Sequence, residues 1–364
     1  MNTIKVLAVD DSALMRRFLD EMLPADQGFE VDTARNGEEA LAEIHRLDPD
    51  VVTLDINMPE MDGVTCLSRI MVESPRPVVM VSSLTEEGAV VTFEALELGA
   101  VDYIPKPDGT VSKNLKTLGP QIQQKVRNAA RARVRQEEPE PQPAHRRPPA
   151  GSGSPDAQPA APATPARVDG VVIIGVSTGG PKSLERIIPY LAADFPYPVV
   201  IAQHIGESFT RLLAERLDEM SPVTVREVNR PTPLVPGEVV IGRGDRDITL
   251  GRRGEQYVAL NLPPDTEGYL WHPSVDRLVW SALELFPPRN VMGVQLTGMG
   301  RDGAEAMQAV HAGGGRTVAE SEETAVVYGM PRELVEKGGA SSVRPLGAVA
   351  DQVNRWAEEG WPCP

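Results

Sequence analysis

One serine of the chain lies in a sequence pattern typical of strained nucleophile turns. Gly175-Val176-Ser177-Thr178-Gly179 matches G-x-S-x-G, follows an apolar run and precedes a helical pattern that opens with Pro181. The free N–H groups at the start of such a helix can stabilise an oxyanion. The same turn also fits a phosphate- or nucleotide-binding loop in which Ser177 merely caps the helix. This segment alone supports both interpretations equally.

A serine nucleophile needs a general base, and three histidines are candidates. The other two of the five histidines fall in a helical pattern of the first half and in a proline-rich segment. His204 ends an apolar run, which places it at the sheet edge expected for Ser177. His272 lies on a loop before a proline, and His311 lies within a helical pattern, as a solvated or capping histidine would. We favour His204, with His272 as the alternative.

The third member of this group is an aspartate in a glycine-rich turn. Asp302 follows the apolar run at 291–298, and an acid that orients a histidine explains it. Gly298, Gly300 and Gly303 of that turn also match the dinucleotide fingerprint G-x-G-x-x-G. Glu320 follows them at about the distance expected of the acid that binds the ribose of a dinucleotide. The charge of Asp302 would repel a pyrophosphate, which disfavours a dinucleotide. The chain order serine, histidine, aspartate differs from that of α/β-hydrolases.

A second group of chemically competent side chains lies in the first half. These residues end or follow four apolar runs, with Asp10 and Asp11 sharing the first: Asp10, Asp11, Asp55, Ser82 and Lys106. The carboxyl ends of strands form the ligand crevice of an open α/β sheet, so these side chains should converge. A single aspartate could be a turn or a helix cap. Three carboxylates together predict a Mg²⁺ site, at which a carboxylate could carry a phosphoryl group.

The elements that must position both groups are short apolar runs alternating with helical patterns. In the first half the runs lie at 5–10, 51–56, 77–82 and 101–105, and in the second half at 171–176, 198–203 and 291–298. This alternation predicts parallel sheets with helices on both faces. Short strands around Thr224 to Leu260, rich in Gly and Pro turns, predict an antiparallel excursion in the second half.

A proline-rich segment separates the halves. Residues 137–166 hold nine prolines and no Val, Ile, Leu, Met, Phe, Tyr or Trp, so they cannot bury a core. We therefore predict a first domain at 1–120, a helix followed by a Pro/Ala-rich disordered linker at 121–166, and a second domain at 167–364. Both domains are expected to be α/β, and the second is expected to be doubly wound and mostly parallel.

Composition restricts where the chain works and what it binds. The 364 residues include 36 basic and 52 acidic ones, a net charge of −16 that repels nucleic acid and anionic membranes. Two cysteines, Cys66 and Cys363, are too few for a disulfide framework and fit a reducing compartment. No signal peptide and no apolar span of about 20 residues are visible. We expect a cytoplasmic monomer that neither inserts into membranes nor binds nucleic acid.

The first half resembles the response-regulator receiver family over residues 4–120. The segments that carry the resemblance are VDDS, LDINMPEMDG, MVSS and IPKP. It implies a flavodoxin-like domain with a five-stranded parallel sheet, in which a histidine kinase phosphorylates Asp55. The resemblance also implies that Asp10 and Asp11 bind Mg²⁺ together with Asp55. Ser82 and Lys106 would contact the phosphoryl oxygens, and Tyr103 would be the aromatic residue that reports phosphorylation.

The second half resembles the chemotaxis-type protein-glutamate methylesterases from Val171 to about Gly339. The segments that carry the resemblance are GVSTGGP, AQHIGESFT, HPSVDRL, LTGMGRDGA and VVYGMPREL. It implies hydrolysis of glutamate methyl esters on chemoreceptor helices, with release of methanol, together with deamidation of receptor glutamines. The resemblance implies that Ser177 is the nucleophile, His204 the base and Asp302 the acid that orients it. The Met299 N–H would donate to the oxyanion, and Thr178 would have a supporting role. No cofactor is implied beyond Mg²⁺ in the receiver.

Two segments depart from the pattern expected of that family. Residues 242–247 read GRGDRD where a Pro-Gly loop ending in histidine is expected. Trp271 stands before His272 where a basic residue is expected. Both segments should rim the substrate cleft and influence the choice of substrate. A phosphorylation-driven adaptor with a degenerate second domain is the alternative, which the intact serine, histidine and aspartate disfavour.

Overall fold

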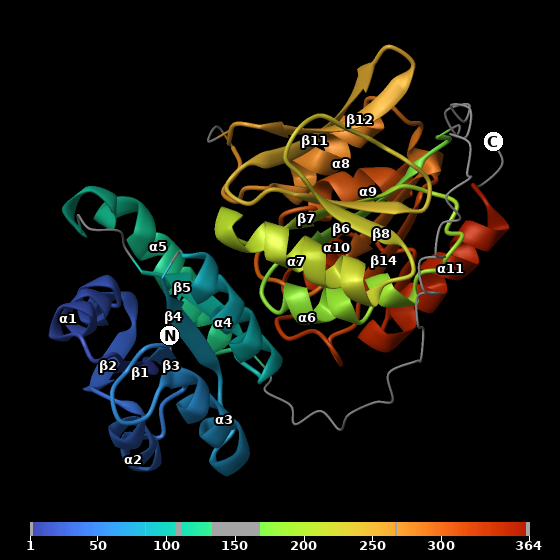
Figure 1. Ribbon diagram of the computed structural model, residues 1–364. Coiled ribbons are helices and arrows are strands. Elements are labelled where there is room, and N and C mark those ends of the chain that lie inside the picture. Colours follow the sequence, from blue (N-terminus) through green and yellow to red (C-terminus); the bar gives the residue numbers. More distant parts are fainter. Residues whose placement is uncertain (1–2, 84, 107–110, 133–167, 266–267, 362–364) are drawn as a thin grey trace, which may run out of the picture. The chain divides into compact units, whose positions relative to one another are not determined.

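The chain forms two compact units, Met1–Glu140 and Pro141–Pro364 (Figure 1). The computed structural model describes residues 3–83, 85–106, 111–132, 168–265 and 268–361. The division falls inside the predicted linker, of which residues 133–166 lie outside the described ranges. The domain boundaries and the disorder of the linker therefore stay predictions. Within the described ranges, no helix is long and apolar enough to cross a membrane.

The first unit is built on a five-stranded parallel sheet with the order β2-β1-β3-β4-β5. Its strands are β1 (Ile4–Val9), β2 (Phe29–Ala34), β3 (Val51–Asp55), β4 (Val78–Ser82) and β5 (Asp102–Pro105). Its helices are α1 (Ala13–Met22), the 3-10 turn η1 (Ala25–Gln27), α2 (Gly37–Leu47), α3 (Gly63–Glu73), α4 (Glu86–Glu97) and α5 (Val111–Ala129). The predicted flavodoxin-like domain is confirmed.

Strand order in this unit brings the ends of β1 and β3 together. From β1 the chain crosses to β2 on one side, whereas β3 pairs with β1 on the other. The polypeptide thus changes winding direction between β1 and β3, and the crevice at such a point is where open α/β sheets bind ligands. Polar caps start the helices that follow the strands: the side chain of Ser12 accepts from Met15 N–H, and that of Asp62 from Thr65 N–H.

The second unit contains a seven-stranded sheet, all of whose pairings are parallel, with the order β15-β14-β13-β6-β7-β10-β8. Its strands are β6 (Val171–Val176), β7 (Val199–Gln203), β8 (Thr224–Val228), β10 (Glu238–Gly242), β13 (Val291–Gln295), β14 (Arg316–Glu320) and β15 (Ser342–Arg344). A separate three-stranded antiparallel sheet holds β9 (Thr232–Pro233), β11 (Asp247–Arg253) and β12 (Gln256–Leu262). The predicted fold class is confirmed.

One expectation about these strands is right only in part. The short strands around Thr224 to Leu260 are predicted to make an antiparallel excursion, but two of them, β8 and β10, pair in parallel and extend the main sheet. The run Val239 to Ile241 in β10 is buried and lies between β7 and β8. Continuous burial of this kind is typical of interior parallel strands. Only β9, β11 and β12 make the antiparallel excursion.

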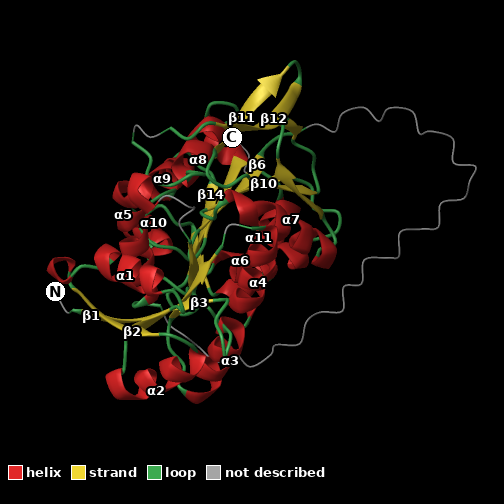
Figure 2. Cartoon of the chain, turned by 60° about the vertical axis from the view of Figure 1, so that its left-hand side comes forward, coloured by secondary structure: helices red, strands yellow, loops and turns green. Residues whose placement is uncertain are grey.

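Helices cover both faces of the seven-stranded sheet. Figure 2 shows α8, α9 and α10 on one side and α6, α7 and α11 on the other. These helices are α6 (Gly180–Glu185), α7 (Glu207–Met220), α8 (Val275–Leu283), α9 (Ala304–Ala312), α10 (Met330–Glu336) and α11 (Val349–Glu359), with 3-10 turns η2 (Ile188–Tyr190), η3 (Pro288–Asn290) and η4 (Leu346–Ala348). Buried side chains of β6, α8 and α9 share one core. The strands are thereby rigid supports for the loops at their ends.

The strand order also places a crevice next to β6. From β6 the chain proceeds to β7 on one side, and β13, on the other side of β6, leads away to β14. The ends of β6, β7 and β13 therefore lie together where the winding direction changes. Ser177, His204 and the turn that contains Asp302 follow these three strands.

Candidate functional site

Ser177 lies in a tight turn between β6 and α6. Its N–H donates to the carbonyl of Thr297 at 2.9 Å, and its own carbonyl accepts from Gly180 N–H at 2.8 Å. Gly179 has φ 79°, and a Cβ there would come within 2.8 Å of Val326 Cβ. Only glycine suits that conformation and that spacing. The turn is thus tied to the β13 loop, the residues between β13 and α9. Ser177 has 8% of its surface exposed.

His204 follows β7 directly and pairs with Asp302. Its N–H donates to Val176 O at 3.0 Å, which places its backbone beside the Ser177 turn. Its Nε2 lies 2.8 Å from Asp302 Oδ2. Its Nδ1 is buried and has no hydrogen-bond partner among the described residues, Ser177 included. The tautomer that donates Nε2–H to Asp302 leaves Nδ1 as the nitrogen able to accept a proton.

Four donors surround the Asp302 carboxylate. Besides His204, these are the Ser274 hydroxyl at 2.9 Å, Val275 N–H at 2.7 Å and Asp276 N–H at 3.0 Å. Ser274 also caps α8, since its Oγ accepts from Arg277 N–H. Burial raises the pKa of Asp302, but the hydrogen bond and charge of His204 and the backbone donors outweigh it and hold the pKa below its ordinary value. Asp302 is therefore a stable anion able to orient a histidine.

An indole covers one face of the His204 ring. The rings of Trp271 and His204 are stacked, with centroids 5.4 Å apart and planes 12° from parallel. The His204 side chain is only 3% exposed. Trp271, which the sequence marked as a departure at the rim, thus touches the candidate base itself. It holds the imidazole plane and keeps water from one of its faces.

The β13 loop supplies a free backbone donor near the serine. Within the described ranges, Met299 N–H has no hydrogen-bond acceptor. Its neighbour Gly298 packs so closely on the serine that a Cβ there would come within 2.6 Å of Ser177 Cβ. Thr297 Oγ1 donates to Thr178 O at 3.0 Å and accepts from Val327 N–H at 2.9 Å, which ties the two turns together. The Met299 N–H therefore follows a residue packed directly on Ser177 and is free to donate to a ligand.

The other candidate histidines lie in different surroundings. His272 Nδ1 lies 3.0 Å from Oδ1 of Asp247, a carboxylate with no exposed surface. His311 Nδ1 lies 3.0 Å from Ser341 Oγ at the end of α9. Neither histidine contacts Asp302 in the described part of the chain.

Glu320 does not act as the ribose-binding acid of a dinucleotide site. Its carboxylate has no exposed surface, and it accepts from Thr297 N–H at 2.8 Å and from the Thr324 hydroxyl at 3.0 Å. Burial raises the pKa of Glu320 to about 7. Glu320 thus ties the end of β14 to the loop that carries Met299.

Replacement of Glu320 by glutamine should stabilise the second unit in a pH-dependent way. The raised pKa means that the folded state binds the proton more tightly than the unfolded chain, so stability falls as pH rises from about 4.5 through about 7. Glutamine keeps an acceptor for Thr297 N–H without the buried charge. We expect a gain of up to about 3 kcal/mol at pH 8 and little at pH 4.5, measured by denaturant unfolding. The exposed Glu323→Gln is the control, and an equal gain at both pH values would contradict the assignment.

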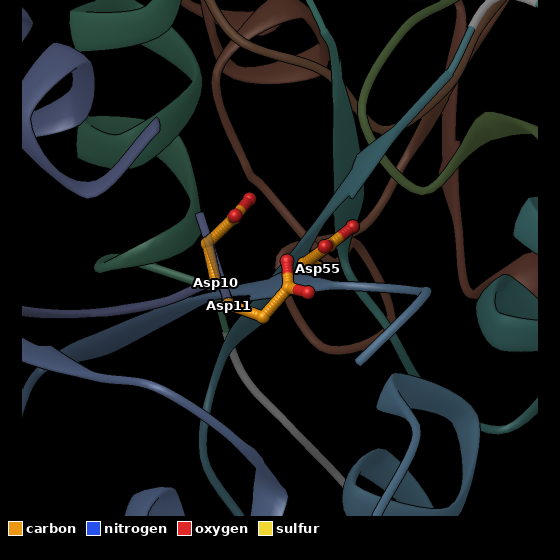
Figure 3. A group of neighbouring side chains, drawn as sticks. All are labelled: Asp10, Asp11 and Asp55. Atoms are coloured by element: carbon orange, nitrogen blue, oxygen red, sulfur yellow. The ribbon is translucent and has the colours of Figure 1, made fainter. Parts of the chain in front are cut away.

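The acidic group of the first unit converges at the end of its sheet. Figure 3 shows the side chains of Asp10, Asp11 and Asp55 beside one another. One carboxylate oxygen from each lies within 4.8 Å of the others. Lys106 Nζ lies 2.8 Å from Asp55 Oδ1 and 3.4 Å from Asp10 Oδ2. The sequence predicted this convergence from strand ends.

The electrostatics of this cluster suit a hard cation. Asp10 Oδ2 and Asp55 Oδ2 are buried and accept no hydrogen bond from the described residues. Burial, and then repulsion from Asp55, raise the pKa of Asp10. Burial raises the pKa of Asp55 as well, although Lys106 opposes it. One amine cannot satisfy three carboxylates, so Mg²⁺, which prefers carboxylate oxygens, fits the donor set.

The remaining predicted receiver residues lie around the cluster with different orientations. The hydroxyl of Ser82 donates towards Ser83 O and Gly88 O and accepts from Thr92 Oγ1 at 2.7 Å, so in this structure it does not point at Asp55. Tyr103 is 5% exposed, with Lys125 Nζ 4.8 Å from its ring centroid. The Lys106–Pro107 peptide bond of the IPKP segment could be cis, which the sequence alone does not decide, and Pro107 lies outside the described residues.

Sequence reasoning missed several residues that shape the second site. Ser274 and the Asp247 carboxylate were not singled out, and Trp271 was assigned only to the rim. Gln295 also escaped notice, although its Nε2 donates to Asp302 O at 2.9 Å and holds the acidic turn. The available signal was the serine two residues before Asp276 in HPSVD, an N-cap pattern at the start of a helix. No local sequence pattern indicates that the rings of His204 and Trp271, which lie far apart in the sequence, are stacked.

Comparisons with known proteins agree on both halves. The family model described as CheB methylesterase matches residues 172–353, and the response regulator receiver domain model matches residues 6–113. The chain is 54% identical to the Rhodospirillum rubrum protein-glutamate methylesterase/protein-glutamine glutaminase 3, over 97% of this chain and 96% of that protein. A Rhodopseudomonas palustris protein of the same description, numbered 2, is 48% identical over 97% and 98%. The crystal structure of the Thermotoga maritima CheB methylesterase catalytic domain is 36% identical, covering 52% of this chain and 99% of that one, with a TM-score of 0.49.

Proposed function

The chain belongs to the CheB methylesterase family and carries a response regulator receiver domain, and from this premise we propose that it hydrolyses glutamate methyl esters on chemoreceptor helices. Deamidation of receptor glutamines to glutamate is the related activity, because relatives bear both names. Both family resemblances seen in the sequence are confirmed. The observation that carries the proposal is the His204–Asp302 pair beside the Ser177 turn, since acyl transfer by a serine needs this combination.

The proposed reaction is a two-step acyl transfer. Ser177 Oγ attacks the ester carbonyl while His204 Nδ1 takes its proton, and the imidazolium then returns that proton to the departing methoxide. This step forms an acyl-enzyme and releases methanol. Water, deprotonated by the same nitrogen, then cleaves the acyl-enzyme to glutamate and free serine. The first step requires the serine side chain to turn towards Nδ1, which it does not contact in the present structure.

The neighbouring residues supply charge stabilisation and orientation. Asp302, held as an anion by four donors, keeps Nε2 protonated and stabilises the imidazolium. We assign the Met299 N–H as the donor to the oxyanion and Thr178, whose carbonyl accepts from Thr297 Oγ1, as a support of the turn. Trp271 fixes the imidazole plane.

The activity is tested directly by methanol release. Purified full-length protein should liberate methanol from a helical peptide or receptor fragment that carries a glutamate methyl ester. A fluorophosphonate reagent should label the protein at Ser177. Absence of both methanol and labelling would leave the adaptor interpretation as the better one.

For the first unit we propose phosphoryl transfer from a histidine kinase to Asp55. Asp10, Asp11 and Asp55 would hold Mg²⁺, which when bound neutralises charge on the phosphoryl oxygens. Lys106 already contacts Asp55 Oδ1 and would pair with a phosphoryl oxygen in its place. Ser82 would release Gly88 O and turn its hydroxyl towards the phosphoryl group.

Phosphorylation of Asp55 is expected to raise esterase activity about tenfold, which requires only about 1.4 kcal/mol of difference between two states. Phosphorylation adds negative charge and acceptors that Lys106 and Ser82 can contact, and thereby changes the receiver surface. The measurement is methanol release from the full chain with and without a small-molecule phosphodonor. Asp55→Asn should show no activation.

A fragment comprising residues 167–364 separates two modes of control. If the unphosphorylated receiver represses the esterase, the fragment should be faster than the unphosphorylated whole chain, because tethering maintains a high local concentration of the repressor. A fragment no faster than the whole chain would contradict repression and favour phosphorylation-dependent docking to the receptor.

A further inference from the structure

A cavity lined by arginines opens beside the catalytic edge of the second unit. Its volume is about 210 Å³. The lining residues come from the loop between β8 and β9, the loop between β10 and β11, and strand β12: Asn229, Arg230, Pro231, Arg243, Arg246 and Asn261. Cofactor-sized ligands occupy about 300–1,000 Å³, so this cavity suits a side chain better than a cofactor.

Two of the three guanidinium groups of this cavity have no carboxylate partner among the described residues. Arg230 and Arg246 form no ion pair with any carboxylate in the described part of the chain, whereas Arg243 pairs with Glu207. The acidic residues on the same loop have other contacts. Asp245 accepts from Glu207 N–H at 3.0 Å, and Asp247 contacts both His272 and Arg277. Arg230 is exposed and Arg246 is half-buried, so both guanidinium groups are accessible to an anionic ligand.

The cavity lies within reach of a substrate bound at Ser177. Strand β10 is the neighbour of β7, and β7 is the neighbour of β6. The loop that carries Arg243 and Arg246 follows β10 as the Ser177 turn follows β6, so this loop begins about 10 Å from the Ser177 turn, two strand spacings away. Asp245 N–H donates to His272 O at 3.2 Å, which connects the arginine loop to the segment that carries Trp271.

We propose that this cavity binds a second carboxylate of the substrate, an unmodified glutamate or aspartate on the same helix as the reacting ester. The assignment rests on the proposed esterase function. A separation of about 10 Å equals about seven residues along a helix, or two turns on the same face. Guanidinium forks match carboxylates in a bidentate manner, and such charge-assisted bonds are the strong ones. The cavity would then select acidic helices and orient the ester towards Ser177.

The test compares two helical peptides that each carry one glutamate methyl ester. One has Glu seven residues away on either side, and the other has Gln at those positions. The full-length chain should show a KM roughly tenfold lower for the acidic peptide, with similar kcat. The double variant Arg230→Gln/Arg246→Gln should lose this preference and keep kcat. A matched control is Arg253→Gln/Arg355→Gln, which removes the same charge at two exposed positions outside the cavity and should keep the preference.

A binding measurement separates this proposal from the esterase function. Fluorescence anisotropy of the labelled peptides on a full-length Ser177→Ala background needs no turnover. Tighter binding of the acidic peptide that depends on Arg230 and Arg246 would support the cavity's role. Equal affinity for both peptides, or an equal loss in the control variant, would overturn it. If the acidic peptide binds through these arginines and no methanol is released by the wild-type chain, the esterase proposal fails and the acid-binding cavity stands as a peptide site.

Discussion

Replacement of Ser177 by alanine is expected to lower methanol release by at least about 10³-fold. The change removes the only proposed nucleophile, while the turn that carries it is held by backbone hydrogen bonds to Thr297 and Gly180, which alanine retains. In the serine-histidine-aspartate template, loss of one member costs several orders of magnitude and leaves only the contribution of the oxyanion site and of binding. The measurement is methanol release from an esterified peptide, with kcat determined separately from KM.

Two controls make this result specific to the nucleophile. Ser208→Ala on α7 removes a buried hydroxyl without a partner among the described residues and should keep activity. Phosphorylation of Asp55 should be unchanged in the Ser177 variant, because that chemistry belongs to the other unit. A Ser177→Ala protein that retains even a tenth of the wild-type rate would refute the nucleophile assignment.

The choice of base should produce the second large effect. His204→Ala is expected to lower kcat to a similar extent as Ser177→Ala, at least about 10³-fold, because it removes both the proton acceptor and the group that Asp302 orients. His272→Ala should mainly raise KM, since its Nδ1 is engaged with Asp247 at the cleft rim. Steady-state kinetics of the two variants on one esterified peptide separate the roles.

The double variant Ser177→Ala/His204→Ala adds a check on cooperation. Residues that act as one unit are not additive, so the double variant should be little slower than either single one. Additive losses, or a larger loss of kcat in His272→Ala than in His204→Ala, would show that the crevice argument selected the wrong histidine.

Much of the candidate site could be predicted because catalytic residues follow parallel strands. The apolar runs that end before Ser177 and His204 become β6 and β7, and the run before Asp302 becomes β13. The carboxyl ends of parallel strands share one edge of the sheet, and residues that follow adjacent strands, such as β13, β6 and β7, therefore lie close together. The same rule brings together Asp10, Asp11 and Asp55.

Some strands, or the direction in which they pair, could not be predicted because the local sequence pattern carries too little information. Strand β2 is an edge strand with burial only at Phe29 and Ala34, so Glu30, Asp32 and Thr33 interrupt any apolar run. Strands β8 and β10 show ordinary strand patterns, but their parallel pairing is a long-range property. An edge strand need bury little, and the direction of pairing is set by neighbours, so neither feature appears in a short window of residues.

The sequence by itself determined the two α/β halves, the proline-rich segment between them and the residue types at each strand end. These features follow from periodicity, turn chemistry and local burial, which operate over a few residues. Only the tertiary structure decided that Asp302 accepts a hydrogen bond from His204, whereas Asp247 contacts His272. It also decided that Trp271 stacks on the His204 imidazole. Finally, it brought Arg230, Arg243 and Arg246 together around one cavity. Each of these contacts joins residues on different loops, and packing of the sheet and helices, not local preference, sets the distances between loops.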